Sequence, residues 1–333
     1  MPASEKRFGC LGVFIVVLLC LSLVFNLLFL VGEVFGIASG APRNFRETVL
    51  TEGVPGVKTK IAVIRLGGLI SSGDMGFGTG ASPDEIRQAF KQALEDKNVR
   101  AIVLAIDSPG GEVTASDDIY NIIRKARDRK KIVVSMGAMA ASGGYYAALG
   151  GSHIIARDTT FTGSIGVIMQ TLNYADLFGK VGLQMVTFKS GKMKDMLSGS
   201  RPSTPEEREY VQGLVMQTYG KFVGIVAAER KIPEDALRNG VADGRVLSGK
   251  DALDAKLIDE LGDLDTAVTK AMELGGANGA TIVEYRAIES LSRYLRMFGK
   301  ADSARSVEIN LGPQSSLHLQ PGRLYLLPEI LAP

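Results

Sequence analysis

The sequence has no tryptophan, two histidines and two cysteines in 333 residues. Both cysteines, Cys10 and Cys20, lie in one apolar segment near the N-terminus. The rest of the chain therefore has no disulfide and no thiol nucleophile. The formal net charge of +2 gives no electrostatic argument for nucleic acid as a partner.

Motifs for bound cofactors are also missing. The chain has no Gly-x-x-x-x-Gly-Lys-Ser/Thr phosphate loop, no His-Glu-x-x-His pair and no paired cysteine motif. We therefore expect neither a nucleotide site nor a metal site, and no cofactor.

The two histidines, His153 and His318, leave few ways to build a Ser–His–Asp triad. His153 starts a predicted strand shortly after the candidate nucleophile Ser142, so we expect its ring to point elsewhere. His318 lies in an irregular C-terminal tail. A serine hydrolase without a usable histidine needs another base, and a desolvated lysine is the main alternative.

One long apolar run, residues 9–32, follows Lys6 and Arg7. About 20 apolar residues are enough to span a bilayer core. The positive charges before the run predict a single-pass anchor in the cell membrane, with a cytoplasmic N-terminus and an extracytoplasmic catalytic domain. A cleaved signal peptide is the competing interpretation, but its apolar region is usually only about 7–15 residues long. Residues 38–41 also offer a site for cleavage after insertion.

The remaining chain alternates between strand and helix patterns, which predicts an α/β domain with a largely parallel sheet. Strands are predicted over residues 60–66, 100–107, 132–136, 153–156, 163–168, 184–188 and 282–286. Helices are predicted over residues 114–129, 142–149, 171–179, 204–230, 233–239, 248–255 and 263–274, with another that begins after Ser82.

These elements predict four segments. Residues 1–37 form a cytoplasmic stub and the anchor, and residues 38–59 form a linker. Residues 60–275 form the catalytic domain. Residues 276–333 form a C-terminal segment that packs on this domain or on a neighbouring subunit.

Ser142 is the candidate nucleophile. It follows a buried strand and a small-residue turn, and it opens a short helix whose N–H groups point toward a bound group. Gly143 and Gly144 leave space beside the hydroxyl. The alternative interpretation is an ordinary helix N-cap serine.

Residues 107–111, with the sequence Asp-Ser-Pro-Gly-Gly, end the preceding predicted strand. Glycines there let the backbone approach a ligand closely. The N–H groups of Gly111 and Ser142 are candidates for an oxyanion hole, in which one donor typically contributes about 3–4 kcal/mol. A plain tight turn is the alternative interpretation.

Three lysines, Lys189, Lys192 and Lys194, lie in a glycine-marked loop and are candidates for the base. An unperturbed lysine has a pKa of about 10.4. Burial lowers that value, so a lysine acts as a base only where water is excluded. Ser164 is placed to orient the lysine amine. The alternatives are solvated surface lysines and an ordinary turn serine.

Taken together, these motifs resemble the signal peptide peptidase A (SppA, protease IV) family, short single-domain type. The resemblance covers about residues 60–275. It rests on residues 107–111, 135–146, 162–167, 191–195, 242–246 and 257–262.

The resemblance implies the roles of four residues. Ser142 is the acylated nucleophile and Lys194 the general base, although the nearby Lys192 leaves the choice of lysine open. Gly111 is the oxyanion-hole glycine, and Ser164 contacts the lysine amine. The enzyme would be a serine peptidase with a Ser–Lys dyad.

The resemblance also implies a fold and partners. The expected fold is a spiral of β-β-α units of the crotonase and Clp-protease type, assembled as a homo-oligomer on the membrane. The serine and lysine of one site can then come from neighbouring subunits. Implied substrates are cleaved signal peptides and other unfolded peptides. A membrane Ser–Lys protease with a dedicated membrane-protein substrate and a non-enzymatic membrane scaffold are the alternatives.

Overall fold

In the computed structural model, the described residues are 14–27, 45–72, 80–287 and 325–326. The chain divides into two compact units. The first comprises residues 1–43 and 289–305, and the second comprises residues 44–288 and 306–333.

In the first unit, residues 14–27 form a helix with an almost wholly apolar sequence. Its side chains are exposed; Leu23, for example, is 70% exposed. No helix in the described part of the chain combines the length and the apolarity that a membrane crossing requires. The expected transmembrane helix over residues 9–32 is therefore not supported by the structure, and both of its ends lie outside the described residues.

The second unit is built on an 11-stranded mixed sheet with the central order β1-β10-β2-β4-β5-β6-β9. Neighbouring strands along this path run parallel except for the β1–β10 pair at the edge. The strands are β1 (Phe45–Thr51), β2 (Lys60–Ile70), β3 (Gly80–Ala81), β4 (Val99–Glu112), β5 (Lys131–Ala141), β6 (His153–Ala156), β7 (Phe161–Gly163), β8 (Val246–Ser248), β9 (Glu260–Leu261), β10 (Thr281–Ala287) and β11 (Tyr325–Leu326). The predicted α/β domain with a largely parallel sheet is confirmed.

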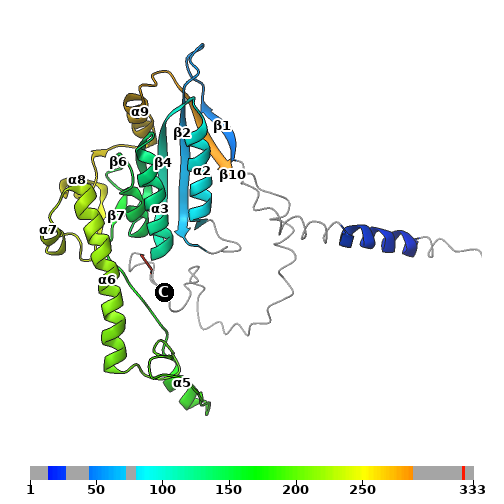
Figure 1. The fold of residues 1–333 in the computed structure, drawn as a ribbon, viewed down its shortest axis with the longest axis vertical. Coiled ribbons are helices and arrows are strands. Elements are labelled where there is room, and N and C mark those ends of the chain that lie inside the picture. Colours follow the sequence, from blue (N-terminus) through cyan, green and yellow to red (C-terminus); the bar gives the residue numbers. More distant parts are fainter. Residues whose placement is uncertain (1–13, 28–44, 73–79, 288–324, 327–333) are drawn as a thin grey trace, which may run out of the picture. The chain divides into compact units, whose positions relative to one another are not determined.

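The second unit also contains eight described helices, several of which pack against the faces of this sheet (Figure 1). They are α2 (Pro83–Glu95), α3 (Val113–Arg127), α4 (Gly143–Ala148), α5 (Ala175–Lys180), α6 (Pro205–Arg230), α7 (Glu234–Arg238), α8 (Gly249–Asp254) and α9 (Leu264–Gly275).

The central strands are apolar on both sides because both faces of the sheet are covered. On β4, Ile102 and Leu104 belong to the core that includes side chains of α2 and α3. Ala101 and Val103 point the other way, into a smaller core with α9. Alternate residues of one continuous apolar run therefore serve two cores.

Two predicted helix starts are confirmed in detail. Before α2, the Ser82 hydroxyl accepts a hydrogen bond from the Glu85 N–H. Before α6, Thr204 and Glu207 form a reciprocal capping box. Such caps satisfy N–H groups that have no partner within the helix.

Strand β1 lies in the stretch expected to form a linker, and it pairs with β10 in the C-terminal segment that was expected to pack on the domain. Three predicted elements differ from the structure. Strand β7 ends at Gly163, so the strand predicted over residues 163–168 does not form, residues 184–188 form no strand, and the helix predicted over 171–179 is reduced to α5. The physical reason is that no residue from Gly166 to Ser198 is buried, so this apolar pattern has no core to pack against in the described part of the chain.

Candidate functional site

Ser142 lies at the sharp turn between β5 and α4. Its backbone has φ 51° and ψ −112°, a conformation that glycine adopts readily and other residues rarely do. The residue is fully buried, and its Oγ has no hydrogen-bond partner among the described residues. A strained backbone that presents an unpaired buried hydroxyl is typical of a functional site.

Glycines after Ser142 let α4 start directly against the end of β4. A Cβ on Gly143 would lie 2.5 Å from Ser116 Oγ and 3.0 Å from the Gly111 nitrogen. A Cβ on Gly144 would lie 2.7 Å from the Ser108 carbonyl oxygen. Neither position has room for a side chain, so the backbones of β4 and α4 meet beside Ser142.

Gly111 is required at its position by close packing. A Cβ there would lie 1.9 Å from the Ile70 carbonyl oxygen, which no side chain tolerates. The structure brings Gly111 next to Gly143 and thus to the turn that carries Ser142.

The second expected oxyanion donor, the Ser142 N–H, donates instead to the Gly163 carbonyl oxygen at 2.8 Å. That bond continues the pairing of β5 with β7, in which Ala141 lies opposite Gly163. The Ser142 N–H is therefore occupied and does not face an open site. The next N–H, that of Gly143, opens α4, where N–H groups lack intrahelical acceptors.

Ser164 directly follows Gly163, so the same bond brings it close to Ser142. Ser164 is buried and also has a positive φ, 50°. Its N–H donates to the Arg245 carbonyl oxygen at 2.8 Å. The structure thus gathers three of the predicted site residues, Ser142, Gly111 and Ser164, at one end of the sheet.

An extended segment pairs with the same end of β4. Strand β11 runs antiparallel to β4, with Tyr325 opposite Glu112 and Leu326 opposite Gly111. The backbone edge beside Gly111 is therefore able to hydrogen-bond to a peptide in the extended conformation.

Lys194, the predicted base, is exposed on the stretch from Gly166 to Ser198, which we call the arm. Its side chain makes no ion pair within the described part of the chain, and its N–H closes a turn onto the Gly191 carbonyl oxygen. Because the Ser142 Oγ has no partner, the two residues do not form a dyad within one chain.

The other two candidate lysines are engaged elsewhere. The Lys189 Nζ lies 2.7 Å from Asp195 Oδ1 and donates to the Lys192 carbonyl oxygen. The Lys192 Nζ lies 2.6 Å from Glu206 Oε1. Of the three amines, only that of Lys194 has no such partner among the described residues.

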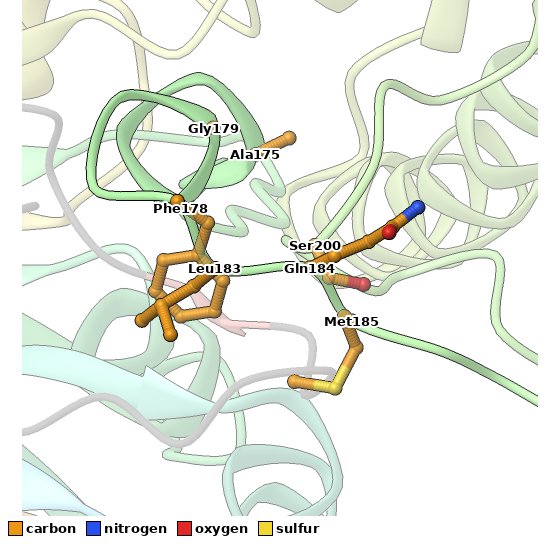
Figure 2. Close-up of a pocket in the computed structure, with 8 residues that line it drawn as sticks. Ala175, Phe178, Gly179, Leu183, Gln184, Met185 and Ser200 are labelled. Carbon is orange, nitrogen blue, oxygen red and sulfur yellow. The ribbon is translucent and has the colours of Figure 1, made fainter.

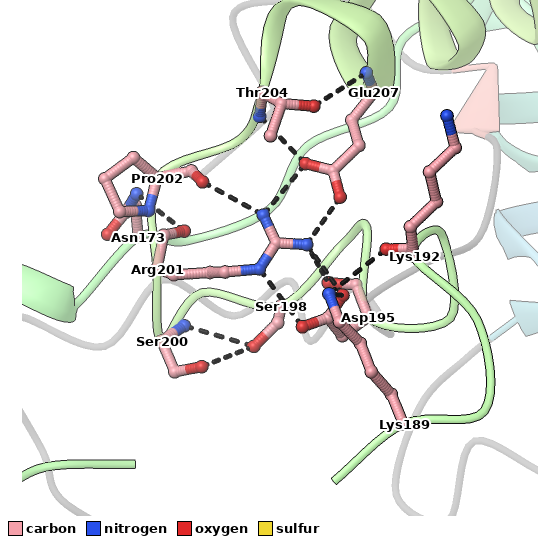
Figure 3. A network of polar contacts seen from close by, with 10 residues as sticks. All are labelled: Asn173, Lys189, Lys192, Asp195, Ser198, Ser200, Arg201, Pro202, Thr204 and Glu207. Atoms are coloured by element: carbon pink, nitrogen blue, oxygen red, sulfur yellow. Dashed lines mark hydrogen bonds and ion pairs between the residues drawn. The ribbon is translucent and has the colours of Figure 1, made fainter. Parts of the chain in front are cut away.

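A polar network at the base of the arm surrounds Arg201 (Figure 3). Arg201 donates from Nε and Nη2 to the two carboxylate oxygens of Asp195, at 3.1 and 2.7 Å. It also donates from Nη1 to Glu207 Oε2 at 2.9 Å. Hydrogen bonds from Arg201, followed by one from Lys189, hold the pKa of Asp195 well below its usual range. Arg201 lowers the pKa of Glu207 to about 2.

Arg201 was not predicted as a site residue. The sequence predicted only that a helix begins at Thr204, whose capping box with Glu207 forms part of this network. Two carboxylates on either side of an arginine, six residues away in each direction, are the only sequence signal for the network.

The arm exposes many apolar side chains. Phe188 is 95% exposed, and Leu172, Val186 and Val181 are also largely exposed. Close to α5, Phe178, Leu183 and Met185 line an open hollow (Figure 2). A surface of this kind on a folded chain indicates a binding partner.

Helix α6 links the arm to the nucleophile helix α4. Tyr146 of α4 donates from its hydroxyl to Asp117 Oδ1 at 2.7 Å, and Lys221 of α6 pairs with Asp117 Oδ2 at the same distance. The rings of Tyr146 and Phe222 lie 4.8 Å apart. The end of α6 that does not carry the arm is therefore firmly attached beside Ser142.

Among the described residues, no histidine is hydrogen-bonded to Ser142. The His153 Nε2 lies 3.1 Å from Glu260 Oε2, and Nδ1 lies 3.9 Å from Asp259 Oδ2, at the far side of β6 from the Ser142 turn. His318 lies outside the described residues. Within those residues, no cluster of three or more histidine, cysteine, aspartate or glutamate side chains is arranged to hold a metal ion.

Two protein-family models match parts of the chain. Residues 124–278 match peptidase family S49, and residues 84–160 match the Clp protease family. The second match agrees with the expected Clp-protease-like α/β fold.

Relatives span a wide range of organisms. A Synechocystis protein provisionally named a protease is 39% identical over 243 residues, which is 72% of this chain and 87% of the relative. The chloroplastic serine protease SPPA of Arabidopsis thaliana is 36% identical over 227 residues, 67% of this chain but 33% of the relative. A protein of Enterococcus faecium, provisionally named signal peptide peptidase SppA, is 36% identical over 198 residues, 59% of this chain and 57% of the relative. The chain belongs to peptidase family S49, the SppA family.

Proposed function

We propose that this peptidase is a serine endopeptidase that uses a Ser142–Lys194 dyad. The observation that carries the proposal is the buried, unpaired Ser142 Oγ on a strained turn beside Gly111 and Gly143. A hydroxyl in this position is free to attack a substrate, whereas an N-cap serine would accept a hydrogen bond from its helix, and none is made here.

In the proposed reaction, the neutral Lys194 amine removes the Ser142 proton while Oγ attacks the peptide carbonyl carbon. The N–H groups of Gly111 and Gly143 stabilise the oxyanion. Lys194 then gives its proton to the leaving amine, and the C–N bond breaks. Water, deprotonated by Lys194, then attacks the acyl carbon; the bond to the Ser142 Oγ breaks, and Lys194 returns the proton to that oxygen. Ser164 accepts a hydrogen bond from the amine and orients it.

The dyad is completed in this proposal by a second copy of the chain. Lys194 is exposed and does not reach Ser142 within one subunit. The arm that carries it exposes apolar side chains, and burial of these side chains against a neighbour would exclude water from the amine. Exclusion of water lowers the pKa of a lysine and makes it a base.

The proposed substrates are extended peptides, in particular cleaved signal peptides. The antiparallel pairing of β11 with Gly111 and Glu112 supports an extended peptide in this place. The provisional name of the Enterococcus faecium relative agrees with signal peptides as a substrate class.

We also propose that residues 9–32 anchor the protein in the cell membrane, with the catalytic domain outside the cytoplasm. The apolar length of this run supports the proposal, as do the exposed apolar side chains of residues 14–27. Carbonate extraction of membranes tests it: a full-length protein that is released into the soluble fraction would contradict an anchor.

The catalytic proposal is tested with a fluorophosphonate label and a peptide substrate. We expect Ser142→Ala to abolish both labelling and cleavage, and Lys194→Ala to abolish cleavage. Lys192→Ala is the matched control in the same loop and should remain active. A wild-type protein without a Ser142-dependent adduct would indicate a scaffold, and cleavage of only one membrane protein would indicate a dedicated protease.

A further inference from the structure

We propose that Arg201 is a positioning residue for the base: it holds the Asp195 carboxylate against the start of α6 and away from the neighbouring Lys194 amine. This inference rests on the proposed dyad. Arg201 does not contact the reacting atoms, so its effect would act through the loop that carries Lys194.

The first step of the argument is that Arg201 uses its whole guanidinium group. Nε and Nη2 bond to the Asp195 carboxylate, and Nη1 bonds to Glu207 Oε2 and to the Pro202 carbonyl oxygen. Nη2 also bonds to Glu207 Oε1. A planar group with five N–H donors can join two carboxylates in this way, whereas a lysine ammonium acts as a single point of charge.

The second step is that this network connects the loop to a fixed element. Glu207 is buried and accepts a hydrogen bond from the Thr204 N–H at 2.8 Å, as part of the cap of α6. Arg201 therefore ties Asp195 to the first turn of a long helix. The other end of that helix packs against α4 through Phe222 and Tyr146.

The third step concerns charge. Lys194 and Asp195 are adjacent in the chain, yet they form no ion pair, because Arg201 and Lys189 both bind the carboxylate. A free carboxylate beside the amine would favour the ammonium form and oppose the role of a base. The charged side chains near this loop, from the loop itself and from the start of α6, are those of Lys189, Lys192, Asp195, Arg201, Glu206 and Glu207.

The test compares the pH dependence of kcat/KM for Arg201→Gln with that of the wild-type assembly. We expect kcat to fall by about 10–100-fold, the loss typical of a misplaced catalytic group, while KM is unchanged. We also expect the pH midpoint of the rising limb to move upward by about one unit, because the Asp195 carboxylate, then held only by Lys189, can approach the Lys194 ammonium and stabilise it.

The double variant Arg201→Gln with Asp195→Asn separates charge from structure. Removal of the released carboxylate should return the pH midpoint to the wild-type value while kcat stays low. A midpoint that remains raised in the double variant, or one that never moves in Arg201→Gln, would overturn the inference.

Two further variants distinguish a loss of activity from a loss of folding. Arg201→Lys keeps the positive charge but cannot bridge both carboxylates, so it should show the same upward shift in a protein that remains assembled by light scattering. Arg230→Lys is the matched control, since Arg230 makes a similar two-point contact with Asp259 at the far end of α6. It should leave the pH midpoint unchanged.

The same assays distinguish failure of the dyad from failure of this inference. If Ser142→Ala or Lys194→Ala retains cleavage, the proposed dyad is wrong. If both are inactive but Arg201→Gln behaves as wild type, only the proposed role of Arg201 is wrong.

Discussion

The turn at Ser142 and the arm that carries Lys194 are opposite kinds of structure within one unit. The turn is fully buried and fixed by glycines that tolerate no side chain. The arm has no buried residue from Gly166 to Ser198 and exposes apolar side chains. The difference teaches that the chain by itself fixes the backbone around Ser142, whereas in the proposed dyad the environment that excludes water from Lys194 would come from a second subunit.

The most direct test of the proposed intersubunit site is to mix two inactive variants. Ser142→Ala and Lys194→Ala should each lose at least about a thousandfold in cleavage, as removal of a nucleophile or base typically does. If each site takes its serine and lysine from different subunits, co-assembly of the two variants creates some sites with both residues intact. We therefore expect partial recovery of peptide cleavage after the variants are unfolded and refolded together. Mixtures that stay inactive, although mass spectrometry shows mixed oligomers, would argue for sites within single chains.

The substitution Gly111→Ala tests the close backbone packing beside the Ser142 turn. Its Cβ would lie 1.9 Å from the Ile70 carbonyl oxygen, so β2 and β4 have to separate locally. We expect a loss of stability of about 2–4 kcal/mol, in the range of severe backbone and packing conflicts, together with loss of cleavage. Urea unfolding measures the first effect. Gly179→Ala, where no atom lies within 4 Å of the added Cβ, is the control and should leave the unfolding midpoint nearly unchanged.

Phe188→Asp probes the arm. Phe188 is 95% exposed in the single chain, so the substitution should leave folding intact and weaken the association that would bury it. We expect smaller particles in light scattering and reduced cleavage that recovers partly at high protein concentration. Val54→Asp, at an exposed apolar position far along the chain from the arm, is the control. Because the chain has no tryptophan, Phe188→Trp adds a single fluorophore whose emission should shift to the blue on assembly.

The smallest expected effect is that of low pH on the stability of the first turn of α6. The folded pKa of Glu207, about 2, lies below its ordinary value near 4.5, so the ionised form is favoured by folding. Its contribution to stability is complete above pH 4.5 and is lost as the pH falls through about 2. The protection factor of the amides at the start of α6, which is the exchange rate corrected for its intrinsic pH dependence, should therefore fall across this window. Glu207→Gln should show low protection already at neutral pH, and a protection factor that stays constant in the wild type would contradict the assignment.

Much of the buried half of the site was predictable from sequence. A buried strand, a small-residue turn and two glycines predicted the Ser142 turn, and the glycine pair at the end of β4 predicted the closeness of Gly111. These features are local, so strand order and backbone sterics determine them. The Ser142 N–H was predicted to be an oxyanion donor, but in the structure it bonds to the Gly163 carbonyl oxygen. The sequence did not reveal the pairing of β5 with β7 that places this acceptor.

The arm was much less predictable. The apolar pattern of residues 184–188 suggested a strand, but a strand needs a partner, and this stretch pairs with no strand among the residues that the structure describes. Arg201 was missed because its role depends on Asp195 and Glu207 meeting on opposite sides of one side chain. Contacts of this kind follow from tertiary structure and not from periodicity.

The backbone conformation of Ser142 has one more consequence. A residue other than glycine in that conformation destabilises the fold by about 1–3 kcal/mol, so Ser142→Gly should make the protein more resistant to heat while it removes the hydroxyl. At this one position, glycine would thus favour thermal stability, whereas serine supplies the hydroxyl that the proposed reaction needs. An inactive relative that no longer needs the hydroxyl is therefore expected to gain stability from glycine at this position.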